Sequence, residues 1–219
     1  MANLRSGTYG NYYGSFFDES EALSSAEMNT NAEYIFSFLT GAGWSANAIA
    51  AMLGNMQAES SLNPGRWQSD NVGNKSSGYG LVQWTPSTNY TNWCSEQGLS
   101  DPSEMDNNLS RILFEVSNGL QWISTTSYNL SFRDFTTSTE AVDYLAKAFL
   151  LNYERPADQS ASVQNYRGEL ATSWFTYITG SEPSDPSDGP GDNSTTRKKY
   201  NFLLFTARRR RNQWTKNYF

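Results

Sequence analysis

The sequence predicts a mainly α fold: a helical domain with a small hairpin or loop lobe, followed by an extended linker and a basic tail. Three observations predict it. Apolar residues recur at helical spacing in several successive segments. A polar stretch that contains several glycines, residues 66–84, interrupts this pattern. Residues 181–196 have the Gly, Ser, Pro and Asp composition of a solvated linker.

The first two predicted helices lead to a single carboxyl group. The first begins near Ser25 and ends at Gly41 and Gly43, because glycine favours the turn that terminates a helix. The second is capped by Ser45 and reaches Glu59. Its core-facing residues are Ile49, Met52, Leu53 and Met56.

The remaining helices are predicted from prolines and apolar stripes. Pro86 and Pro102 each suit the first turn of a helix. A short helical piece is expected at residues 121–125, and a turn or one helical winding at residues 131–137. A strong helix begins at residues 139–140 and ends before Pro156. The last helix, residues 163–178, carries an apolar stripe of Tyr166, Leu170, Trp174 and Tyr177.

Four segments divide the chain. Residues 1–24 are rich in Gly and Tyr without periodicity, so we expect an irregular arm, either flexible or packed on a neighbouring protein. Residues 25–180 form the helical domain, and residues 181–196 the linker. Residues 197–219 form a basic, aromatic tail that contains 8 of the 16 Lys and Arg residues and no Asp or Glu.

Composition excludes several classes of enzyme. The chain has no histidine, which rules out Ser-His-Asp and Cys-His catalysis and the usual zinc-hydrolase ligands. Its single cysteine, Cys94, cannot form an internal disulfide, and we expect it to be a small buried apolar residue. No apolar stretch is long enough to span a bilayer, and residues 1–17 lack the apolar core of a signal peptide. We expect no metal and no cofactor.

Glu59 is the candidate catalytic residue. It lies three residues beyond Met56 and seven beyond Met52, so it shares their face of the helix. A carboxyl group flanked by apolar side chains is costly to ionise, and it can therefore hold a proton for transfer to a leaving group. The alternative is that Glu59 is an ordinary surface charge at the end of a helix.

Three short blocks carry a resemblance to a known family. They are residues 59–64 (ESSLNP), residues 80–84 (GLVQW) and residues 152–156 (NYERP). In this order they resemble the tail-associated lysozymes of bacteriophages, which are similar to soluble lytic transglycosylases and goose-type lysozymes. The resemblance covers roughly residues 25–180 and implies a lysozyme-like fold with Glu59 as general acid.

The same resemblance implies substrate-binding residues. The second block would line the sugar groove, with Gly80 allowing close approach and Gln83 offering both a donor and an acceptor. Ser60 follows the acid in the first block, and Tyr153 would sit over the acid. Tyr79 would stack on a sugar or pack in the core, whereas Trp84 is expected nearer the core. A buried core position is the alternative for Tyr153.

The identity of a second carboxylate is open. A hydrolase needs one that faces the acid, whereas a lytic transglycosylase can manage without it. Asp70, in the loop between the first two blocks, is the best candidate, although an Asx-turn role is at least as consistent with its position. Glu154 is the other candidate, but its neighbour Arg155 suggests a structural ion pair.

The function expected is cleavage of the β-1,4 bond between N-acetylmuramic acid and N-acetylglucosamine in bacterial peptidoglycan by a phage virion protein. The alternatives are a structural tail-tip or core virion protein with weak or no activity, and an endolysin released at lysis. Residues 197–219 are expected to be disordered, to dock on another tail or core virion protein by adding a strand, or to contact nucleic acid.

Overall fold

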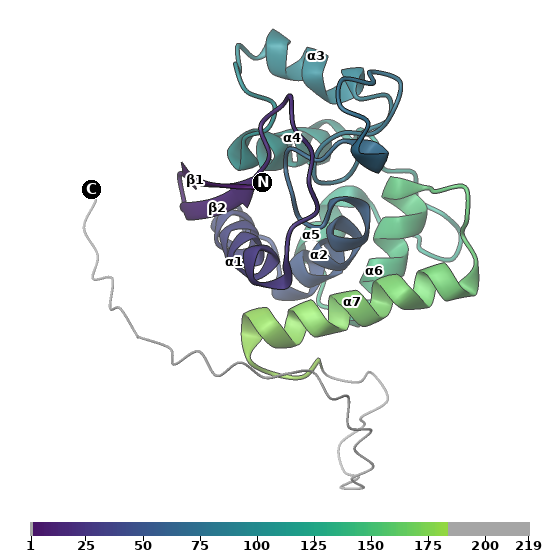
Figure 1. Ribbon diagram of the computed structural model, residues 1–219. Helices are drawn as coiled ribbons and strands as arrows, with labels where there is room; N and C mark the ends of the chain where they lie inside the picture. Colours follow the sequence, from purple (N-terminus) through teal and green to yellow (C-terminus); the bar gives the residue numbers. More distant parts are fainter. Residues whose placement is uncertain (1, 184–219) are drawn as a thin grey trace, which may run out of the picture. The chain divides into compact units, whose positions relative to one another are not determined.

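The computed structural model describes residues 2–183, which form a mainly helical unit (Figure 1). Most of the predicted linker and the whole predicted tail lie outside the described residues. The helices are α1 (Ser25–Gly41), α2 (Ala46–Ser60), α3 (Thr88–Glu96), α4 (Met105–Asn118), α5 (Phe132–Thr137), α6 (Val142–Phe149) and α7 (Ala161–Thr179). Two short helical turns, η1 (Gln68–Asp70) and the π-helical η2 (Leu150–Glu154), and a hairpin of β1 (Asn3–Gly7) and β2 (Gly10–Gly14) complete it. The predicted mainly α class is confirmed.

Serine side chains start the first two helices. Ser24 is the N-cap of α1, one residue before the predicted start, and it forms a capping box with Glu27. Ser45 caps α2 as predicted, with its Oγ accepting a hydrogen bond from Ala48 N at 3.1 Å. These bonds satisfy backbone donors that the first helical turn leaves unpaired.

The N-terminal arm is a β-hairpin packed on α1, so the expectation of an irregular arm was wrong. Leu4 pairs with Tyr13 across the two antiparallel strands. Asn31 of α1 bonds both backbone groups of Tyr13, each at 2.7 Å, and Tyr12 is buried against Tyr34. An isolated two-stranded hairpin is marginal in water. These contacts with α1 stabilise it, and local sequence cannot reveal them.

Residues 66–84 form the expected small lobe as a loop rather than a regular hairpin. Isolated bridges join Tyr79 to Trp67 and to Trp84. The Tyr79 ring lies 4.6 Å from that of Trp67, and Trp84 stacks on Tyr90 of α3 at 4.4 Å. Aromatic packing therefore takes the place of a strand ladder in this lobe.

Several helix boundaries differ from the predictions. Pro86 and Pro102 precede α3 and α4 instead of lying in their first turns, and residues 121–125 form no helix. Residues 131–137 do form a helical winding, α5, which Ser131 caps through Asp134 N. The helix that ends before Pro156 is continuous from α6 into the π-helical turn η2.

Helix α7 packs closely on α2. A Cβ added at Gly54 of α2 would lie 2.6 Å from the backbone nitrogen of Ala171, so only glycine fits at this approach. The buried face of α7 uses Arg167, Gly168, Ala171 and Trp174. Of the predicted stripe only Trp174 is buried, whereas Tyr166 and Tyr177 are exposed. The small residues set the contact face because they allow the two helix axes to approach.

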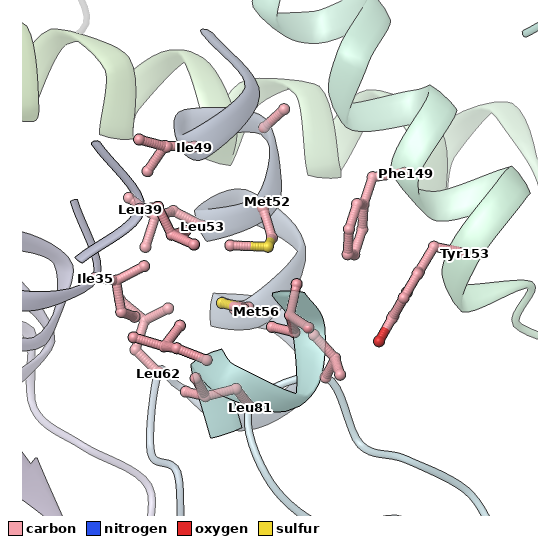
Figure 2. Packing of buried hydrophobic residues seen from close by; sticks show 14 of the residues in the cluster. Ile35, Leu39, Ile49, Met52, Leu53, Met56, Leu62, Leu81, Phe149 and Tyr153 are labelled. Atoms are coloured by element: carbon pink, nitrogen blue, oxygen red, sulfur yellow. The ribbon is translucent and has the colours of Figure 1, made fainter. Parts of the chain in front are cut away.

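The core surrounds α2, whose residues 48–56 are all buried. Figure 2 shows Phe149 and Tyr153 stacked side by side and turned toward the side of α2 that carries Met52 and Met56; their ring centroids are 4.5 Å apart. Cys94 is buried, as predicted. Between residues 2 and 183 no helix combines the length and apolar character needed to cross a membrane.

Candidate active site

Glu59 lies in the last turn of α2, at the end of its buried face. Its side chain is 21% exposed, and its Oε1 accepts a hydrogen bond from Arg167 Nη2 of α7 at 2.6 Å. Oε2 accepts no hydrogen bond from any described residue. The carboxyl group is therefore held by one oxygen and open at the other.

Arg167 is a site residue that the sequence analysis missed. Its side chain is 9% exposed, and its Nη1 donates to the carbonyl oxygen of Asn55 at 2.7 Å. A planar guanidinium with two anchored nitrogens fixes the Glu59 carboxyl in direction as well as distance. The sequence feature that could have identified Arg167 is its position directly after Tyr166, a residue of the predicted stripe. The predicted stripe did not include Arg167, so the residue was not recognised as facing α2.

The second block is positioned by backbone geometry. Gly80 has φ +84°, and a Cβ there would lie 2.6 Å from Asn108 Oδ1, which accepts a hydrogen bond from Leu81 N at 3.0 Å. The Gln83 side-chain nitrogen donates to the carbonyl oxygens of Gly80 and Arg66 at 2.8 and 3.0 Å. These bonds hold the Gln83 amide at the edge of an open cavity.

Two predicted substrate-binding residues are buried. Ser60 is 1% exposed, and its Oγ donates to the carbonyl oxygen of Leu81 at 2.8 Å. It therefore ties the end of α2 to the second block. Tyr79 is fully buried, between Trp67, Phe17 and Tyr90. Of the two roles considered for Tyr79, the structure supports core packing.

Glu115 of α4 joins the second and third blocks and was also missed. Its Oε1 accepts from Trp84 Nε1 at 2.9 Å and from Arg111 Nε at 2.8 Å, and its Oε2 accepts from the Tyr153 hydroxyl at 2.5 Å. Burial raises the pKa of Glu115, against the opposing effects of the Tyr153 hydrogen bond and the Arg111 charge. The sequence feature that could have identified Glu115 as buried is its position three residues after Ile112, on the buried face of α4.

Tyr153, which the resemblance would place over Glu59, forms its hydrogen bond with Glu115. Its hydroxyl is committed to Glu115, and its side chain is 1% exposed. Burial, and then the charge of Glu115, raises the pKa of Tyr153 well above its usual range, so the hydroxyl is a neutral donor. The core position considered for Tyr153 is confirmed, and the residue also lines the cavity.

Asp70 makes structural contacts. Its Oδ1 lies 2.8 Å from Arg66 Nε and accepts from Ser20 Oγ, also at 2.8 Å. Its side chain is 53% exposed, and it is not among the residues that line the cavity. Asp70 thus joins the loop to the N-terminal segment. A catalytic role for Asp70 stays a prediction that these contacts do not favour.

An open cavity of about 250 Å³ lies between the second and third blocks. Residues 82–85, 121 and 153–155 line it, so Gln83 and Tyr153 meet there with Glu154. Burial raises the pKa of the Glu154 carboxyl well above its usual range, and the nearby charge of Glu59 raises it further, whereas Arg167 lowers it. Glu59 of α2 and Arg167 of α7 therefore lie close enough to act on Glu154, although neither lines the cavity itself.

The ion pair expected between Glu154 and Arg155 is not formed. Arg155 Nη1 donates instead to the carbonyl oxygens of Asn152, at 2.6 Å, and of Gln121. Arg155 has φ +49°, where the chain leaves η2 in a left-handed conformation. This turn directs the guanidinium to backbone carbonyls and away from its neighbour's carboxyl group.

The fold and site thus define a mainly helical domain in which Arg167 orients the carboxyl group at the end of a buried helix, and comparison with known proteins gives its family. The family described as phage tail lysozyme matches residues 30–178, and the chain belongs to it. The chain is also similar to "Morphogenesis protein 1" of Bacillus phage B103, with 48% identity over 165 residues. That match covers 75% of this chain and 44% of the relative, so the chain spans less than half of the length of that protein.

Proposed function

We propose that this protein is a virion-associated peptidoglycan glycosidase that cleaves the β-1,4 bond between N-acetylmuramic acid and N-acetylglucosamine during wall penetration. The observation that carries the proposal is the Glu59 carboxyl. Arg167 orients it through Oε1, its Oε2 is open, and its charge acts on Glu154, which lines the cavity with Gln83 and Tyr153. The family supports the substrate class, because phage tail lysozymes are named for lysozyme activity.

Glu59 would act as the general acid. In its protonated form it would give the proton to the glycosidic oxygen as the bond to the anomeric carbon breaks, with the bonding electrons going to that oxygen. The oxocarbenium-like centre would then be captured by water or by the sugar's own hydroxyl. Gln83 would orient the sugar through its amide oxygen, because its nitrogen is already bonded to the backbone.

The test is mass analysis of the muropeptides released from purified peptidoglycan by the wild type and by Glu59→Gln. Loss of a general acid reduces the rate by about a hundredfold to ten-thousandfold. Glu96→Gln, an exposed substitution in α3, is the matched control and should keep wild-type activity. A folded Glu59→Gln protein that released muropeptides at the wild-type rate would contradict the proposal. A wild type without products would instead favour the structural virion role.

We also propose that residues 197–219 attach the protein to another tail or core virion protein. The support is the sequence alone, in which a short aromatic run among eight basic residues follows a solvated linker. Deletion of residues 181–219 should spare cleavage of purified peptidoglycan and remove the protein from assembled particles. Incorporation of the truncated protein into virions would contradict this attachment role.

A further inference from the structure

The carboxyl groups considered for catalysis or for the site differ in their partners. Glu59 is paired with Arg167, Glu115 with Arg111, and Asp70 with Arg66. Glu154 forms no ion pair with any described residue, and its Oε1 is buried without a hydrogen-bond partner. An unpartnered buried polar atom is costly, so a site that keeps one usually has a use for it.

Glu154 also lies where a substrate would be. It is the last residue of the π-helical turn η2, between Tyr153 and Arg155, and all three line the cavity together with Gln83. The residue is half-buried although its Oε1 is covered. Asp70 does not line the cavity, and both of its oxygens bond Arg66.

We propose that Glu154, rather than Asp70, is the second carboxyl group that acts with Glu59 in cleavage of the sugar bond. The inference rests on the proposed function. Two arginines act on Glu154, but Arg167 bonds Glu59 and Arg155 bonds backbone carbonyls, so neither forms an ion pair with Glu154. One guanidinium can balance the charge of only one of two carboxylates, and in the proposed reaction the two carboxyl groups share one proton.

The reaction balances around that proton. Glu59 carries it before cleavage and gives it to the leaving oxygen, and the anomeric carbon–oxygen bond breaks with its electrons on that oxygen. The attacking hydroxyl, from water or from the sugar itself, bonds the anomeric carbon and passes its proton to Glu154. After cleavage Glu59 is left without its proton, and Glu154 holds the proton of the attacking hydroxyl. Exchange with solvent then returns the proton to Glu59.

The electrostatics support this role. The groups that act on Glu154 are Glu59 on α2, Arg167 on α7, Glu115 on α4 and Arg155 after η2. Burial and the two carboxylates raise its pKa, which makes its ionised form a stronger base than an ordinary carboxylate.

The activity test compares Glu154→Gln with Asp70→Asn in the full chain, by release of muropeptides from purified peptidoglycan. Glu154→Gln should lower the rate by about a hundredfold or more, whereas Asp70→Asn should stay within about threefold of the wild type. Glu154→Asp, which keeps a carboxyl group, should retain more activity than Glu154→Gln. The reverse order of the Gln and Asn variants would overturn the proposal.

A second readout does not depend on activity. Because the folded-state pKa of Glu154 is raised, its contribution to stability is present below its ordinary pKa of about 4.5 and is lost as the pH rises through the folded value. Glu154→Gln lacks this loss, so its Tm should rise relative to the wild type as the pH increases above about 4.5. Parallel Tm curves would overturn the assignment. A wild type that released no muropeptides would overturn the proposed function itself, whatever the Tm curves show.

Discussion

Glu59 and Glu115 both act electrostatically on Glu154 and both bind an arginine, yet their surroundings differ. Glu115 is 1% exposed and accepts hydrogen bonds from Trp84, Arg111 and Tyr153, so both of its oxygens are committed. Glu59 is 21% exposed and uses one oxygen. Glu115 therefore joins α4 to the second and third blocks, whereas Glu59 keeps one oxygen without a hydrogen bond from any described residue.

Glu115→Gln should produce the largest loss of stability. It leaves the buried charge of Arg111 without its partner and gives Tyr153 and Trp84 a poorer acceptor. Removing one member of a buried ion pair costs about 3–5 kcal/mol. Chemical denaturation would measure it. If the free energy of unfolding were unchanged, Glu115 would not have the structural role that distinguishes it from Glu59.

Arg167→Lys should cause the next largest loss of stability, and it tests whether Arg167 orients Glu59. A lysine cannot bond Asn55 O and Glu59 Oε1 together in the fixed geometry of the guanidinium. We expect a loss of about 1.5–3 kcal/mol in stability, the range for hydrogen bonds to charged groups, and a lower kcat at little changed KM. An unchanged kcat would show that the orientation of Glu59 does not depend on Arg167.

Trp84→Phe removes one donor from Glu115 and keeps the aromatic ring that stacks on Tyr90. Two donors remain on the carboxylate, so the expected loss is that of one ordinary hydrogen bond, about 0.5–1.5 kcal/mol. Thermal unfolding checks it. Combining Trp84→Phe with Glu115→Gln should cost less than the sum of the two changes, because both break the same bond.

Asp70→Asn should have the smallest effect on stability. The pair with Arg66 is more than half exposed on the Asp70 side, and exposed pairs contribute about 0.2–1 kcal/mol. The effect should shrink further at high salt because exposed charges are screened. A loss larger than that of Trp84→Phe would show that the link from Asp70 to Ser20 organises the loop.

The sequence by itself determined the local features. Helical spacing located α1, α2 and α4, Ser25 and Ser45 indicated the starts of the first two to within one residue, and the three motif blocks indicated the family and the candidate acid Glu59. These signals depend on residues within a few positions of each other. Even so, the short strands of the hairpin escaped prediction because their stability comes from α1.

Only the tertiary structure decided which side chains meet. Arg167 and Glu59 are 108 positions apart, Tyr153 and Glu115 are 38 apart, and Trp84 and Glu115 are 31 apart. The close α2–α7 contact at Gly54 sets the first pairing, and the packing of Tyr90, Trp84 and Phe149 sets the others. No local pattern encodes such pairs, because a charge is satisfied by whatever partner the packing of the helices brings within hydrogen-bonding distance.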